Sequence, residues 1–227
     1  MFFDEYYLLL VLPAVILSLI AQGMVRGAFS KFSKVRSAVG TTGAGVATSI
    51  LERNGVYDVK VEAVAGRLTD HYDPRKKVLR LSTDVFGSSS VAALGVAAHE
   101  AGHALQHAGK YSPLALRGAL LPVANIGSNI GPYMAMAGFI FNIGILIDIG
   151  IILFIAAVLF YVITLPVEFN ASGRALVELE RGGVLNHGEL AGAKKVLRAA
   201  AMTYLASALV AFASLARLIL LRNRRRR

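Results

Sequence analysis

Apolar and polar residues occur in long blocks along this chain. Three apolar blocks, residues 6–22, 118–141 and 144–165, are each long enough to cross a bilayer, since one crossing takes about 20 residues. A hairpin near residues 142–148 separates the last two. A fourth apolar block, residues 199–221, precedes an arginine-rich tail. This pattern predicts a polytopic membrane protein that is mainly α-helical.

The charges beside these blocks predict how the chain is oriented. Asp4 and Glu5 precede the first block, and a basic segment at residues 26–36 follows it. Cytoplasmic flanks are rich in lysine and arginine, so the first block should begin outside and end in the cytoplasm. A cleaved signal peptide would instead carry its positive charge in front. A fourth crossing would place the arginine tail outside, so we expect residues 199–221 to pack in or on the membrane without crossing it fully.

Shorter periodic segments lie between the first two apolar blocks. Residues 41–52 have helical character. Residues 56–64 alternate between apolar and polar side chains, which indicates a half-exposed strand. Asp73-Pro74 is typical of a turn, and residues 77–82 form a second short strand. The sequence therefore predicts a small β element in front of the next helix.

That next helix carries the candidate chemistry. Residues 90–107 form an alanine-rich run with serines before it as N-caps and Gly109 after it as C-cap. The run contains His99, Glu100 and His103 in an H-E-x-x-H pattern. Histidines four residues apart project from one face of a helix, one turn apart, so both rings can bind one ion. A glutamate beside the first histidine can take a proton from water, as in zinc peptidases.

A hydrolytic zinc site takes three protein ligands, and a chain without cysteine must supply them from His, Asp or Glu. His107 lies about 12 Å along the helix from His99, too far to share an ion with both motif histidines. Glu168 is the better candidate because two crossings return it to the side of the catalytic helix. Its own helix is expected over residues 167–181, with Pro166 in the first turn. Topology alone also allows Asp70, Asp73 and Asp84 as the third ligand. Glu178 and Glu180 lie on the same side of the membrane, but they have the character of a solvated helix face.

Four stretches of the chain carry a resemblance to a known family. They are residues 66–74 (GRLTDHYDP), 90–106, 166–172 and 194–204. The chain resembles the bacterial membrane neutral zinc metallopeptidases of the YugP-like family and, more distantly, the HtpX-type membrane proteases. The likeness extends from the first apolar block to the fourth. The resemblance implies that His99, His103 and Glu168 bind zinc and that Glu100 is the catalytic base.

Neighbouring residues are expected to orient these ligands and to stabilise charge. The related proteases usually have an aspartate four residues after the ligand glutamate, where this chain has Ser172, and the YugP-like pattern has one where this chain has Asn170. Either oxygen can accept a histidine N–H without adding a charge. The candidates for donating to a developing oxyanion are His71, Tyr72, His187 and Tyr204. Turn, loop or interfacial positions would explain the same four residues without catalysis.

The segment at residues 68–82 leads into the catalytic helix. Extended peptides can add to an exposed strand edge through main-chain hydrogen bonds. We therefore expect a substrate to pair along residues 78–81.

Together these features predict a zincin-like pair of helices with a small β element in a multi-pass protein of the cell membrane. The expected activity is that of a zinc metalloendopeptidase, with Zn²⁺ as cofactor and the catalytic side in the cytoplasm. Its partners would be membrane or membrane-proximal polypeptides and anionic lipid headgroups. The formal net charge is +10, and the basic residues lie beside apolar blocks, where anionic lipid headgroups explain them. We therefore expect no nucleic-acid partner.

Five segments follow from this prediction. They are an N-terminal span (1–24), a catalytic segment (25–117), a two-span hairpin (118–166), cytoplasmic helices with the third ligand (167–198) and a C-terminal apolar segment with its basic tail (199–227). Two other classes of protein remain as alternatives. A catalytically silent metal-binding scaffold would not need Glu100. A small transporter or channel would use Asp148, which we otherwise expect in the hairpin near the outer interface.

Overall fold

The computed structural model describes residues 4–226, and most of them are helical. The chain divides into two compact units, which are described separately. The sheet unit comprises Gly23–Leu114 and Val167–Ala201, and the bundle unit comprises Met1–Gln22, Ala115–Pro166 and Met202–Arg227. The mainly α-helical class with a small sheet is confirmed.

The helices of the sheet unit begin and end where the sequence indicates. α2 (Gly43–Arg53) begins after Thr42, whose side chain accepts a hydrogen bond from the backbone of Gly45. α4 (Val91–Ala108) begins after Ser90, whose hydroxyl accepts from the backbone N–H of Ala93 at 3.3 Å. Gly109 ends α4, as predicted. Such N-caps satisfy N–H groups that have no partner within a first helical turn.

The sheet has three strands, one more than the sequence predicts. They are β1 (Lys60–Val64), β2 (His71–Asp73) and β3 (Val78–Ser82), in the order β1-β3-β2. β1 is parallel to β3, and β2 is antiparallel to it. β1 begins four residues later than expected, and His71 and Tyr72 lie in a strand rather than in a turn.

The central place of β3 overturns one expectation. β1 lies along one edge of β3 and β2 along the other, so residues 78–80 have no free edge for a substrate strand. Alternation of side chains reports the two faces of a strand and does not distinguish a central strand from an edge. A short helix, α3 (Thr83–Phe86), also separates the sheet from α4.

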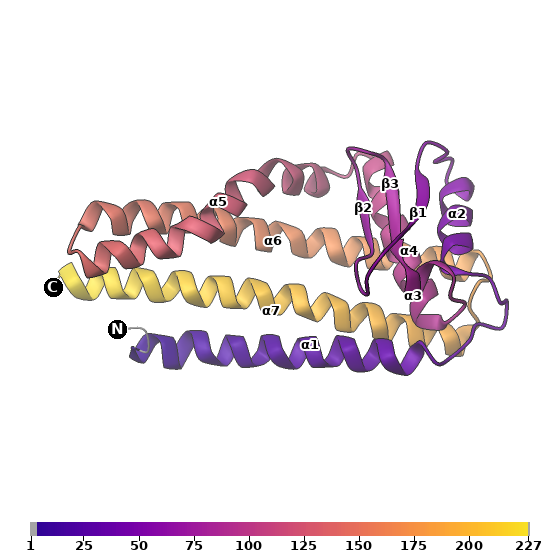
Figure 1. Cartoon of the computed structure of the whole chain (residues 1–227), viewed down its shortest axis with the longest axis horizontal. Helices are drawn as coiled ribbons and strands as arrows, with labels where there is room; N and C mark the ends of the chain where they lie inside the picture. The colour runs from indigo at the N-terminus through magenta and orange to yellow at the C-terminus, as the bar shows by residue number, and fades with distance from the viewer. Residues whose placement is uncertain (1–3, 227) are drawn as a thin grey trace. The chain divides into compact units, whose positions relative to one another are not determined.

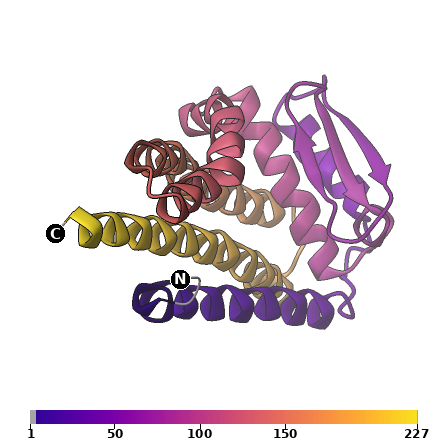
Figure 2. The ribbon, with the colours of Figure 1, turned by 60° about the vertical axis from the view of Figure 1, so that its left-hand side comes forward.

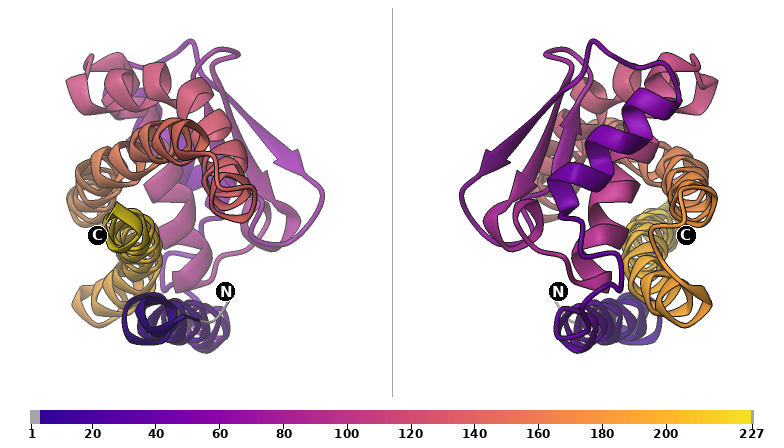
Figure 3. Two further views of the ribbon diagram at one scale, coloured as in Figure 1. Left: turned by 90° about the vertical axis from the view of Figure 1, so that its left-hand side faces the viewer. Right: turned by 90° about the vertical axis from the view of Figure 1, so that its right-hand side faces the viewer.

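The core of the sheet unit lies between the sheet and its helices. α2 and α4 pack against each other and lie on the same face of the sheet (Figures 2 and 3). Leu79 and Leu81 of β3 are fully buried there, together with Leu94 of α4. Burying such side chains stabilises a fold by about 1.5–3 kcal/mol each, so this core holds α4 firmly.

Four helices supply the bundle unit, and two of them join segments that were predicted separately. They are α1 (Leu12–Phe32, preceded by a π-helical turn, Tyr7–Val11), α5 (Ser112–Ile140), α6 (Gly144–Arg181) and α7 (His187–Arg226). α6 continues through Pro166, which was expected to start a new helix. α7 runs through the expected boundary at residues 198–199. Hydrophobic blocks predict which residues lie within a membrane, whereas these helices continue beyond the blocks into polar sequence.

Three described helices are long and apolar enough to cross a membrane. They are Tyr7–Phe32, Gly144–Arg181 and His187–Arg225. The C-terminal segment, which was expected not to cross fully, is therefore long and apolar enough to do so. α5 was expected to cross but is not among the three, because Asn125, Ser128 and Asn129 and two prolines interrupt its apolar residues.

Ion pairs at one end of the bundle unit balance the charge of arginines near the end of the chain. Asp4 pairs with Arg217, and Glu5 pairs with Arg224. The start of α1 therefore lies beside the end of α7 (Figure 1). Asp148 lies within α6 rather than in the hairpin, and it pairs with Arg222. These acidic residues supply opposite charge to the arginines at the end of α7.

Glycines allow α5 and α6 to pack closely within the bundle unit. A Cβ atom added at Gly127 would lie 2.1 Å from the carbonyl oxygen of Leu153. Overpacking of this kind typically costs about 1–3 kcal/mol. We therefore expect Gly127→Ala to lower the midpoint of thermal unfolding in detergent. Gly118→Ala in the same helix is the control, because the added Cβ atom has open space around it and should leave the unfolding midpoint unchanged or raise it. Equal midpoints for the two variants would contradict this packing.

Candidate metal centre

The spacing of the motif brings its two histidines together on α4. Four residues separate His99 from His103, so their rings lie one turn apart on one face. The ring centroids are 4.7 Å apart, and the planes are nearly perpendicular at 83°. Both imidazoles are largely shielded from solvent.

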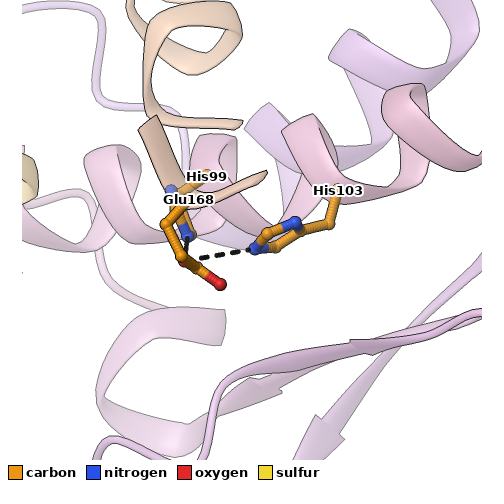
Figure 4. Close-up of side chains that lie close together, drawn as sticks. All are labelled: His99, His103 and Glu168. Carbon is orange, nitrogen blue, oxygen red and sulfur yellow. Dashed lines mark ion pairs between the residues drawn. The ribbon is translucent and has the colours of Figure 1, made fainter. Parts of the chain in front are cut away.

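Glu168 on α6 completes a cluster of three ligand groups. Its Oε2 atom lies 3.3 Å from Nε2 of His99 and 3.6 Å from Nε2 of His103 (Figure 4). One ligand atom from each of the three residues lies within 4.8 Å of the others. The Glu168 residue is only 2% exposed, although a carboxylate is costly to bury without charged partners. The sequence prediction of these three residues therefore agrees with the geometry.

The separations within the cluster fit a small divalent cation. Ligand atoms bound to a tetrahedral zinc at ~2.1 Å lie ~3.4 Å from one another. The two distances from the Glu168 oxygen, 3.3 and 3.6 Å, are close to that value. Two imidazole nitrogens and one carboxylate oxygen also form a donor set found in catalytic zinc sites. His99, His103 and Glu168 can therefore hold zinc.

A glycine lets the two ligand-bearing helices approach. A Cβ atom added at Gly102 would lie 2.6 Å from the carbonyl oxygen of Ala171. Ala171 follows Glu168 by three residues on α6, and Gly102 immediately precedes His103 on α4. The absence of a side chain at residue 102 therefore brings the glutamate within reach of the histidines.

Each histidine has a different hydrogen-bond partner on its other ring nitrogen. Nδ1 of His99 lies 3.1 Å from the hydroxyl of Ser172. Nδ1 of His103 lies 3.0 Å from Oε1 of Gln106, a fully buried side chain on the same helix. The Gln106 amide in turn donates to Oδ1 of Asn170 at 3.0 Å. Ser172 and Asn170 were both predicted to orient the histidines; Ser172 contacts one directly, and Asn170 reaches the other through Gln106.

Glu100 lies next to the cluster in sequence without belonging to it. Its residue is 9% exposed. Within residues 4–226, its carboxylate forms no hydrogen bond or ion pair. It is therefore available to accept a proton, as a general base must be.

Charge raises the proton affinity of one ligand histidine. Burial by itself would lower the pKa of His103, but the carboxylate of Glu168, 3.6 Å from its Nε2 atom, and the negative charge of Glu100 raise it above its ordinary value. A proton and a metal ion would thus compete for the same ring.

The predicted oxyanion donors are spread over different places. His71 is exposed on β2 and contacts the carbonyl of Thr69, while His187 is exposed at the start of α7. The hydroxyl of Tyr72 bonds to Nδ1 of His107 at 2.8 Å. Tyr204 belongs to the bundle unit. Burial raises the pKa of Tyr72 to about 12, so its hydroxyl keeps its proton at neutral pH.

The other carboxylates considered as third ligands are engaged elsewhere or remote from the cluster. Asp70 accepts from Ser82, Asp73 from the backbone of the turn that follows it, and Asp84 from Arg67. Glu178 is buried rather than solvated, because it pairs with Arg53. Glu180 is exposed, as expected of a helix face.

Gln106 is the site residue that sequence reasoning did not identify. The H-E-x-x-H pattern ends at His103 and does not include Gln106. Its position three residues after His103 places both side chains on one helix face, which is the pattern that could have indicated their contact.

Comparison with known proteins agrees with a cluster of residues that could hold zinc. Residues 7–223 match the model of a family described as "Putative neutral zinc metallopeptidase". The chain belongs to this family of zinc metallopeptidases. A relative in Bacillus subtilis (strain 168), described as "Putative membrane protease YugP", is 47% identical over 215 residues, which are 95% of this chain and 96% of the relative. No solved structure matches the chain.

Proposed function

We propose that this protein is a membrane-embedded zinc metalloendopeptidase, with zinc held by His99, His103 and Glu168 and with Glu100 as general base. The observation that carries the proposal is the convergence of three ligand atoms from two helices at separations suited to one zinc ion. The family and the B. subtilis relative support the same class of activity.

The chemistry follows from the roles that these residues can perform. Bound zinc would polarise the scissile carbonyl and lower the pKa of a water molecule towards about 7. Glu100 accepts the proton of the attacking water and later delivers it to the leaving amine. Ser172 and Gln106 hold the two imidazoles in place through their Nδ1 atoms.

The segment that joins His103 to Glu168 supports the proposal that the chain crosses the membrane four times. His103 precedes and Glu168 follows the segment Ala115–Pro166, yet both reach one site. An even number of crossings must therefore separate them. If α6 crosses, α5 crosses too, despite its polar residues. The side chains of Ser128 and Asn129 donate hydrogen bonds to the carbonyl oxygen of Asn125 in the same helix, which lowers the cost of placing them in a membrane.

Four crossings would put the first and the last described residues on the same side of the membrane. Asp4 and Glu5 pair with arginines near the end of α7, which is consistent with this placement. The basic segment at residues 26–36 then lies on the side of the metal site, which the positive-inside rule assigns to the cytoplasm. Substrates would be polypeptides in or near the membrane, reached from the cytoplasmic side.

Removing the third ligand tests the proposed metal site. We expect Glu168→Gln to weaken zinc binding by at least about 10²-fold, because the anionic ligand is lost. Zinc content and chelator competition would be measured on protein purified in detergent. Glu178→Gln is the matched control, since it changes a buried glutamate on the same helix that pairs with Arg53. Equal zinc affinity in wild type and Glu168→Gln would contradict the site.

A further inference from the structure

We propose that Gln106 is a positioning residue that selects the tautomer of His103, at the end of a hydrogen-bond relay that begins at Arg174. The inference rests on the proposed zinc-binding role of His103. The relay runs from Arg174 through Asn170 and Gln106 to His103. At each step, only one assignment of hydrogen-bond donor and acceptor is favourable.

The first step fixes the amide of Asn170. Nε of Arg174 donates to Oδ1 of Asn170 at 2.8 Å. A guanidinium has donors and no acceptor, so the side-chain oxygen of Asn170, not its nitrogen, must face it. The same Oδ1 atom lies 3.0 Å from Nε2 of Gln106.

The second step fixes the amide of Gln106. Its Nε2 atom donates both to Oδ1 of Asn170 and to the carbonyl oxygen of Val167, the latter at 2.8 Å. A flipped amide would turn its oxygen towards these two acceptors and lose both hydrogen bonds. Gln106 is fully buried, so water cannot replace them, and each buried group left unsatisfied costs about 1–3 kcal/mol.

The third step fixes the proton on His103. With Nε2 of Gln106 occupied, Oε1 faces Nδ1 of His103 at 3.0 Å. This oxygen only accepts, so Nδ1 must carry the proton. Nε2 of His103 is then left with its lone pair on the side of Glu168 and His99, which is the form that binds a metal.

The relay matters because Glu168 favours the opposite tautomer when no metal is bound. The Glu168 carboxylate lies 3.6 Å from Nε2 of His103 and would attract a proton to that nitrogen. His99 has no equivalent constraint, because the hydroxyl of Ser172 can donate or accept. The relay therefore prepares His103, specifically, for metal binding without adding a charge beside the site.

Nitrogen NMR of histidine-labelled, zinc-free protein at alkaline pH tests the tautomer directly. We expect Nδ1–H on His103 in the wild type and in Asn170→Asp, which keeps an acceptor for Gln106. In Gln106→Met the proton should move to Nε2, and zinc affinity should fall by about 10–100-fold. Glu180→Gln, on the exposed face of α6, is the control and should leave the His103 resonances unchanged.

The outcomes separate this inference from the proposed function. An unchanged His103 tautomer in Gln106→Met, or a zinc affinity equal to that of the wild type, would overturn the relay. The tautomer is read without metal, so it still tests the relay if the wild-type protein fails to bind zinc. That failure would instead contradict the proposed function.

Discussion

Replacing Glu100 by glutamine should leave zinc bound while slowing peptide hydrolysis by about 10²–10⁴-fold, the usual contribution of a general base. Glutamine has nearly the same shape but cannot accept a proton from water. Glu100 lies outside the cluster of three ligand groups, so its replacement removes no ligand. Zinc content and cleavage of labelled casein would be measured on the same detergent-purified preparations.

The comparison with wild type also separates an enzyme from a silent metal-binding scaffold. In a scaffold, wild type and Glu100→Gln would behave alike in every cleavage assay. Glu180→Gln is the matched control, because it makes the same change on an exposed face of α6 and should keep full activity. Loss of zinc from Glu100→Gln would show that the carboxylate supports the metal site rather than the chemistry.

The sequence predicts the two histidines of the cluster because the determinants of their positions are local. A helix with serine before it and Gly109 after it fixes the relative positions of His99 and His103. Glu168 lies 65 residues after His103, and the topology of the apolar blocks, together with the family resemblance, identifies it. The spacing of the histidines follows the period of a helix, and the length of the apolar blocks follows the thickness of a bilayer, so both can be read from the sequence.

The features that escaped prediction depend on contacts between distant segments. Gln106 acquires its role only when α6 brings Asn170 against it. β2 is too short to show a strand period, and its partner β3 was mistaken for an edge. The suitability of α7 for crossing was hidden by Arg217, whose charge is matched by a residue more than two hundred positions away.

Replacing Gly102 by valine should disrupt the metal site without touching any ligand. A Cβ atom at residue 102 would already lie 2.6 Å from the carbonyl oxygen of Ala171, and valine adds two further methyl groups. The backbone of α6 must then move away from α4, and it carries Glu168 with it. Because a displacement of about 1 Å at a catalytic site can cost 10²-fold in rate, we expect zinc affinity and peptide cleavage each to fall by about that factor or more.

Gly173→Val provides the control for this loss. Gly173 lies on α6 near Ala171 but is exposed, and an added Cβ atom there meets open space. Both variants place a β-branched residue in a helix, so the intrinsic change in helix propensity is similar. Gly102→Ala should show an intermediate defect, since it adds only the Cβ atom. If Gly102→Val bound zinc as tightly as Gly173→Val, the close approach of α4 and α6 would not be what holds Glu168 beside the two histidines.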